Sequence, residues 1–115
     1  MKVDPVTGAI PVKFGDEIIE LRFTNSAFAY LEDEANVDSA QDAIARLADG
    51  MVNGKIVFSM VIAFGRAFLR AAKKDPDLVD AVNRGELIEA VTALTLSVIE
   101  ANTGDANPQT AAGQN

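Results

Sequence analysis

The sequence predicts an α+β domain that is mainly α, in which an N-terminal β-hairpin packs on a bundle of four to five α-helices. Two observations support this fold class. Apolar and polar residues alternate along residues 10–23, the pattern of paired strands that bury one face. From residue 24 onward, apolar residues recur every three to four positions between cap and stop signals, which is the helical pattern. Because a lone two-stranded hairpin is unstable, we expect helices to cover its apolar face.

The hairpin is predicted from its turn. Gly15-Asp16 fits a two-residue loop, in which glycine readily adopts a positive φ. Such a loop places Val12 opposite Ile19 and Ile10 opposite Leu21. The apolar side chains then share one face of the hairpin: Ile10, Val12, Phe14, Ile19, Leu21 and Phe23.

Two shorter helices are expected next. Thr24 or Asn25 can cap a helix that runs to about residue 35, and its inner face should cover the hairpin. Ser39, with an acidic residue three positions later, resembles a capping box for a second helix. We expect Asp49-Gly50 to end that second helix.

The longest helix is expected from Lys55 to about Lys74, and it carries two apolar seams rather than one. The uncharged run at its start is about half of the roughly 20 residues that a membrane-spanning helix requires, so we interpret it as buried helix and predict no membrane contact. The first seam consists of Val57, Val61, Phe64 and Phe68. The second seam lies one residue further round the helix and consists of Phe58, Ile62, Gly65 and Leu69.

Two further helices complete the predicted domain. Asp75-Pro76, an N-cap followed by proline, predicts a short helix to about Asn83. A last helix should run from Glu86 to about Ala101, with apolar residues at helical spacing. The polar residues 102–115 hold no large apolar side chain, so we expect a disordered tail there. The predicted organisation is an N-terminal extension at 1–9, a single domain at 10–101 and this tail.

Composition excludes most catalytic chemistry. The 115 residues contain no cysteine and no histidine, which excludes thiolate nucleophiles, Cys/His zinc sites and Ser-His-Asp triads. No P-loop or GxGxxG motif is present, so we predict no catalytic, cofactor or metal site and no enzymatic activity. The net charge of −7 and the lack of Trp argue against nucleic acid as a partner. The N-terminus lacks a secretory pattern, so we expect a cytoplasmic protein.

Charged residues form two groups. A basic stripe at the end of the longest helix is interpreted as interaction with the helix dipole and pairing with the acidic helix, and docking of an acidic partner is the alternative. At their spacing on helices the acidic side chains do not point toward one common position, as a metal site requires. We therefore interpret them as a solvated face. The stripe is Arg66, Arg70, Lys73 and Lys74, and the acids are Glu32, Asp33, Glu34, Asp38, Asp42 and Asp49.

The second seam has two interpretations. The last helix of the chain could cover it, which we favour, or it could form an exposed groove for an apolar segment of another chain. Gly65 lies inside a long helix, where glycine costs about 1 kcal/mol relative to alanine and usually marks the close approach of another backbone. If a partner binds, the candidate surfaces are the hairpin edge and the second seam, Phe58, Ile62, Gly65 and Leu69.

The order of these segments resembles a known family. A hairpin ending in GDEIIELRFT, then SAFAYLEDEAN, then DSAQDAIARLADG and a long apolar helix is similar to the small tail assembly chaperones of long-tailed phages, in the branch shared with gene transfer agents. The similarity covers residues 10–101 and rests on a pattern of elements rather than on a catalytic signature. It implies a cytoplasmic chaperone, without enzymatic activity, that binds the tape measure protein, keeps it soluble and helps recruit tail tube subunits.

Two other functions remain open from the sequence. The chain could be a structural or adaptor subunit retained in a phage tail or gene transfer agent particle, and its presence in purified particles would decide this. It could also be a helical regulator whose acidic face neutralises a basic partner, which predicts salt-sensitive binding. Self-association into a homo-oligomer is open as well.

Overall fold

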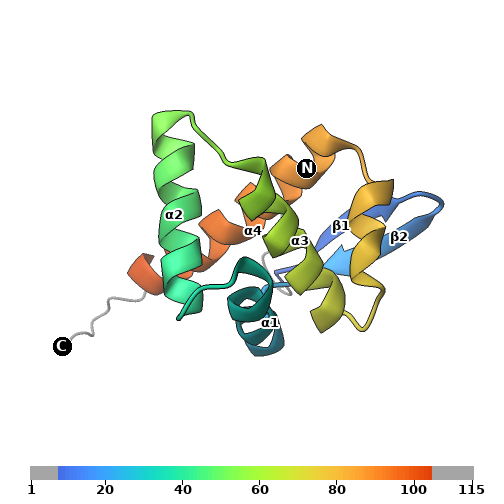
Figure 1. Ribbon diagram of the computed structural model, residues 1–115, viewed down its shortest axis with the longest axis horizontal. Helices are drawn as coiled ribbons and strands as arrows, with labels where there is room; N and C mark the ends of the chain where they lie inside the picture. Colours follow the sequence, from blue (N-terminus) through green and yellow to red (C-terminus); the bar gives the residue numbers. More distant parts are fainter. Residues whose placement is uncertain (1–7, 105–115) are drawn as a thin grey trace.

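The computed structural model describes residues 8–104, and within them a two-stranded hairpin is followed by four α-helices and one 3₁₀ helix (Figure 1). The predicted α+β, mainly α fold is confirmed. The elements are β1 (Ile10–Phe14), β2 (Glu17–Leu21), α1 (Asn25–Ala35), α2 (Ala40–Asn53), α3 (Phe58–Ala71), η1 (Pro76–Ala81) and α4 (Arg84–Gly104).

The hairpin has the predicted register. Val12 lies opposite Ile19 and Ile10 opposite Leu21 in an antiparallel pair. Gly15 adopts a φ of 63°, as the two-residue turn requires. Its N–H donates to the carbonyl oxygen of Ala81 over 3.1 Å, which fastens the turn to the end of η1.

The expectation that the first helix covers the hairpin is wrong. Helix α1 packs mainly against α3, while β1 lies against α4 and η1. Phe23, just after β2, explains the difference: its ring stacks on Phe28 at 4.6 Å and meets the edge of Phe68 at 4.9 Å. This aromatic contact directs the chain from the hairpin toward α3. The longer α4 supplies the apolar surface for the hairpin instead.

The second helix does not end at Asp49-Gly50 as predicted. Helix α2 continues to Asn53 and is closed by Gly54, which has a φ of 70° and donates its N–H to the Gly50 carbonyl. A glycine inside a helix costs about 1 kcal/mol, which is too little to end a helix that gains further hydrogen bonds. The Lys55 N–H also donates to the Gly50 carbonyl oxygen, at 2.8 Å. The returning chain therefore passes directly over Gly50.

Gly50→Ala should destabilise the protein, although this exchange usually stabilises a helix interior. A Cβ at this position would lie 2.8 Å from the Lys55 carbonyl oxygen, and a backbone atom cannot rotate away. We expect the free energy of unfolding to fall by about 1 to 2 kcal/mol in urea denaturation. The neighbouring exposed Asp49→Ala is the control and should gain about 0.5 kcal/mol from helix propensity. A gain from both substitutions would contradict the close approach.

Helix α3 is shorter than predicted at both ends. Its C-terminus closes in a Schellman motif: Lys74 N–H donates to the Leu69 carbonyl at 2.9 Å and Lys73 N–H to the Arg70 carbonyl at 3.0 Å. Lys73 adopts the left-handed conformation, with a φ of 62°, where glycine is usual. A side chain in this region is strained.

Lys73→Gly should therefore stabilise the protein. Glycine adopts positive φ without the Cβ clash, so we expect a gain of about 1 kcal/mol in the free energy of unfolding. Asn36 closes α1 with a φ of 55°, and Asn36→Gly is a matched control. Because asparagine tolerates this conformation better than lysine, its replacement should gain less. Equal gains in thermal denaturation would argue against strain specific to Lys73.

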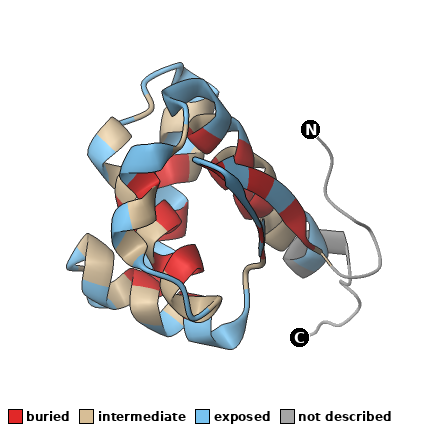
Figure 2. Ribbon diagram, turned by 90° about the vertical axis from the view of Figure 1, so that its right-hand side faces the viewer, coloured by how far each residue is buried: buried red, intermediate tan, exposed pale blue. Residues whose placement is uncertain are grey.

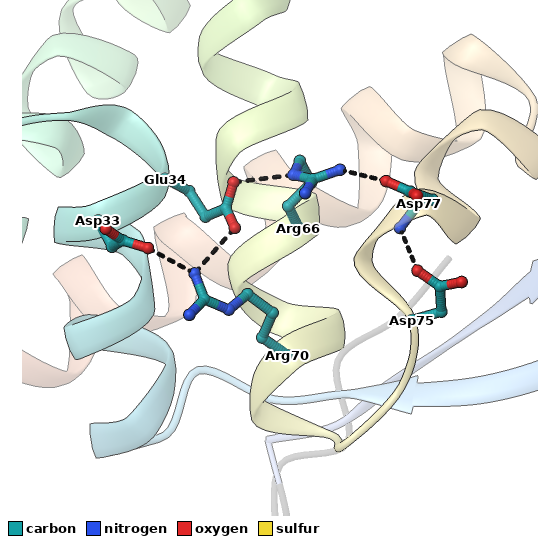
Figure 3. Close-up of polar contacts among 6 residues, drawn as sticks. All are labelled: Asp33, Glu34, Arg66, Arg70, Asp75 and Asp77. Atoms are coloured by element: carbon teal, nitrogen blue, oxygen red, sulfur yellow. Dashed lines mark hydrogen bonds and ion pairs between the residues drawn. The ribbon is translucent and has the colours of Figure 1, made fainter.

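The last two elements are close to expectation. The segment after Asp75-Pro76 is a 3₁₀ helix that ends at Ala81, and the Asp75 side chain accepts from the Asp77 N–H at 2.9 Å (Figure 3). Helix α4 begins at Arg84, before the predicted Glu86, and runs to Gly104. The first three residues of the predicted disordered tail are thus helical. The rest of that tail, 105–115, and residues 1–7 of the predicted extension lie outside the described residues.

The buried residues of the helices and the hairpin face a common interior (Figure 2). Its largest fully buried side chains include Phe14 from β1 and Phe64 and Phe68 from α3. Thr95 is the buried polar residue of α4, and its hydroxyl donates to the Val91 carbonyl oxygen at 2.8 Å. Within residues 8–104, no helix combines the length and the hydropathy that a membrane span needs.

Candidate functional site

The second seam is divided along α3. Leu69 is fully buried and Gly65 is buried as well. A Cβ on Gly65 would lie 3.0 Å from Leu87 Cδ1 and 3.1 Å from Val79 Cγ1. Side chains of α4 and η1, rather than another backbone, therefore approach this glycine. This half of the seam belongs to the core of the chain itself.

The N-terminal half of the second seam is more accessible. Phe58 and Ile62 are both half-buried. The guanidinium carbon of Arg84, from the start of α4, lies 4.7 Å from the centre of the Phe58 ring, a cation–π contact that covers part of this ring. Of the predicted partner-binding residues, these two keep exposed surface in the folded domain.

Two residues of the basic stripe, Arg66 and Arg70, bind the acidic helix, as the sequence predicted, whereas Lys74 pairs with Glu17 of β2 at 2.7 Å. Arg66 Nε donates to Glu34 Oε1 at 2.8 Å, and Arg70 Nη1 donates to Glu34 Oε2 at 2.9 Å (Figure 3). Arg66 also binds Asp77, and Arg70 also binds Asp33. These hydrogen bonds raise the pKa of both guanidinium groups, chiefly through Asp77 for Arg66 and Asp33 for Arg70. Arg66 therefore links both α1 and η1 to α3, and Arg70 adds a second link to α1.

The predicted solvated face of acids is confirmed for Asp33, Asp38, Asp42 and Asp49, which are exposed, but not for Glu32 and Glu34, which are partly buried. Glu32 caps a helix, because its Oε2 accepts from the Ala40 N–H at 3.0 Å at the start of α2. Glu34 keeps only 14% of its side chain exposed, between the two arginines. These carboxylates satisfy groups on neighbouring elements, which linear spacing alone could not show. The described residues contain no group of three or more candidate metal-ligating side chains.

An apolar surface at the junction of α2 and α3 was not predicted. Val52 is 85% exposed and Val57 is 63% exposed. Beside Val57 a groove of about 350 Å³ is lined by Arg46 and Leu47 of α2 and by Val57 and Met60 at the start of α3. We call Arg46, Leu47, Val57 and Met60 the α2–α3 corner. Helix α2 and the hairpin lie at opposite ends of the molecule (Figure 1).

The sequence misplaced Val57 in the first seam. The other members of that seam, Val61, Phe64 and Phe68, are buried as expected. Val57 is exposed because α3 begins only at Phe58, so Val57 is the N-cap residue and leaves the helical surface. The sequence contained one signal for the exposure of Val57. Asn53-Gly54 predicts a turn, which places the apolar residues on either side of it, Val52 and Val57, next to a turn.

The hairpin edge, the other candidate partner-binding surface from the sequence, stays a prediction. Ile18 points away from the core and is 69% exposed, and the strands of the described sheet pair only with each other. The apolar groove described above is lined by residues of α2 and α3 and does not include Ile18. The α2–α3 corner is therefore the stronger candidate.

Comparisons with protein-family models, with characterised proteins and with solved structures gave no match. The features of this chain that bear on its function are therefore the apolar α2–α3 corner and the pattern of elements along residues 10–101.

Proposed function

We propose that this protein is a phage or prophage tail assembly chaperone that binds the tape measure protein in the host cytoplasm. It keeps that protein soluble and promotes assembly of the tail tube. The observation that carries the proposal is the α2–α3 corner, where the exposed Val57 lines an apolar groove. The resemblance of residues 10–101 to tail assembly chaperones supplies the biological setting.

The corner suits a chaperone that works by holding its client. Apolar side chains exposed singly are common, but Val57 lines a groove in a domain whose other large apolar residues are mostly buried. A long helical protein awaiting assembly exposes apolar segments that would otherwise associate with each other. A binder of such segments lowers their free concentration by mass action and needs no catalytic group.

Co-expression tests this proposal. The full chain, carrying an affinity tag, is produced together with the tape measure protein encoded in the same gene cluster, and solubility and co-purification are measured. We expect the tape measure protein to become more soluble and to co-purify with the chain. A tagged unrelated domain of similar size and charge is the control.

Two outcomes would defeat the proposal. One is a tape measure protein that neither binds the chain nor gains solubility from it. The other is recovery of the chain in purified particles at a constant ratio to tail subunits, which would favour the structural or adaptor subunit instead.

A further inference from the structure

We infer that the groove between α2 and α3 binds an acidic amphipathic helix of another protein. Its apolar residues lie against Leu47, Val57 and Met60, and one of its carboxylates lies beside Arg46. This inference rests on the proposed function and describes the segment of the partner that is recognised.

The walls of the groove favour a helix as the occupant. They are formed by side chains of two helices, whose backbone groups are bonded within each helix except for the first N–H groups of α3. An extended segment would bring its own N–H and C=O groups against these apolar walls without partners, which is costly. A helix bonds its backbone internally and presents apolar side chains at i, i+3, i+4 and i+7. The groove lies at the lower end of the range of about 300–1,000 Å³ for ligand sites, so it takes only a few such side chains.

The charges around the groove favour an acidic occupant. Arg46, which lines the groove, forms no ion pair with the described residues, in contrast to Arg66 and Arg70. The N-terminus of α3 adds to this positive potential, because Val57 offers no side-chain cap and the first turn contains no acid. Unbonded N–H groups at a helix N-terminus carry partial positive charge and attract carboxylates.

Neighbouring acids limit where the carboxylate of the partner can lie. Asp42 and Asp49 are exposed on α2, one turn before and one turn after Arg46. They repel an acidic segment that runs along α2, so the favoured position of the carboxylate is on the Val57 side of Arg46.

Val57→Asp separates binding from folding. Aspartate is a good N-cap residue, so it should raise the thermal unfolding midpoint by capping α3. It also removes an apolar contact and puts a negative charge at the groove. The probes are two fluorescent amphipathic peptides of about 20 residues, with the same leucine face and with either glutamate or lysine flanking it. We expect the full-length chain to bind the glutamate peptide more tightly and Val57→Asp to weaken that binding by about tenfold or more.

Matched variants locate the effect at the groove. Arg46→Glu should weaken binding of the glutamate peptide, whereas Lys13→Glu, the same charge change on the exposed surface of β1, should not. Ile18→Asp is the corresponding control for Val57→Asp. Ionic strength is held near 0.15 M, where the Debye length is about 8 Å and local charges dominate over the net charge.

Three results would overturn the inference. They are equal or tighter binding of the lysine peptide, no loss of affinity in Val57→Asp, and sedimentation showing a dimer of the chain that Val57→Asp dissociates. The inference and the proposed function can fail separately. Selective binding of the glutamate peptide without capture of the tape measure protein would defeat only the function. Capture that Val57→Asp leaves unchanged would defeat only the inference.

Discussion

Leu69→Ala is expected to lower the free energy of unfolding by about 3 to 4 kcal/mol, the range for a fully buried leucine that leaves a cavity. Leu69 has no exposed surface, and the adjoining core includes Phe64 and Phe68 of the same helix. Well-packed neighbours on a helix cannot collapse into the vacated volume, so the cavity should persist. Urea denaturation followed by circular dichroism measures the loss.

Ile62→Ala is the matched control for Leu69→Ala. Both positions belong to the second seam, but Ile62 is only half-buried near the start of α3. Removing its side chain should cost about 1 kcal/mol, because less apolar surface returns to water. Equal losses at the two positions would show that the seam is not divided into a buried half and an accessible half.

Glu34→Gln is expected to lower the free energy of unfolding by about 2 kcal/mol, as for the loss of hydrogen bonds to charged groups. The Glu34 carboxylate accepts from both Arg66 and Arg70 and keeps 14% of its side chain exposed. The amide has the same shape but no charge, and one of its ends can only donate. One guanidinium therefore loses its acceptor at the contact between α1 and α3.

The control for Glu34→Gln is Asp33→Asn, whose side chain is 72% exposed and binds Arg70 alone. An exposed ion pair contributes about 0.2 to 1 kcal/mol, so this loss should be small and should shrink further in high salt. Thermal denaturation of both variants at low and high salt makes the comparison. A loss at Asp33 as large as that at Glu34 would mean that the network is governed by net charge rather than by the shared carboxylate.

Local features of the fold could be predicted from the sequence. The register of the hairpin follows from Gly15-Asp16, because a two-residue turn fixes which residues face each other. The caps at Thr24, Ser39 and Asp75 follow from side chains that accept from N–H groups two or three residues away. These interactions lie within a few residues of each other, so the local sequence suffices to specify them.

The candidate site was only partly predictable. Periodicity identified the second seam as apolar but not which element covers it. Gly65 and Leu69 are buried by segments that follow much later in the chain, such as Leu87, while Phe58 and Ile62 near the start of the helix remain accessible. The exposure of Val57 depended on one residue at a helix boundary, where sequence patterns are least informative.

The sequence by itself determined the fold class, the elements, the turn register and the caps of this protein, because short-range hydrogen bonds and the period of apolar residues specify them. Only the tertiary structure decided that α1 packs on α3 and that α4 and η1 cover the hairpin. It also decided that the α2–α3 corner stays open. The apolar faces of the helices and of the hairpin are chemically similar, so their residue types alone do not specify which faces pack together. The pairing among them is settled by shape, by Phe23 between β2 and α1, and by the ion pairs of Glu34 with Arg66 and Arg70.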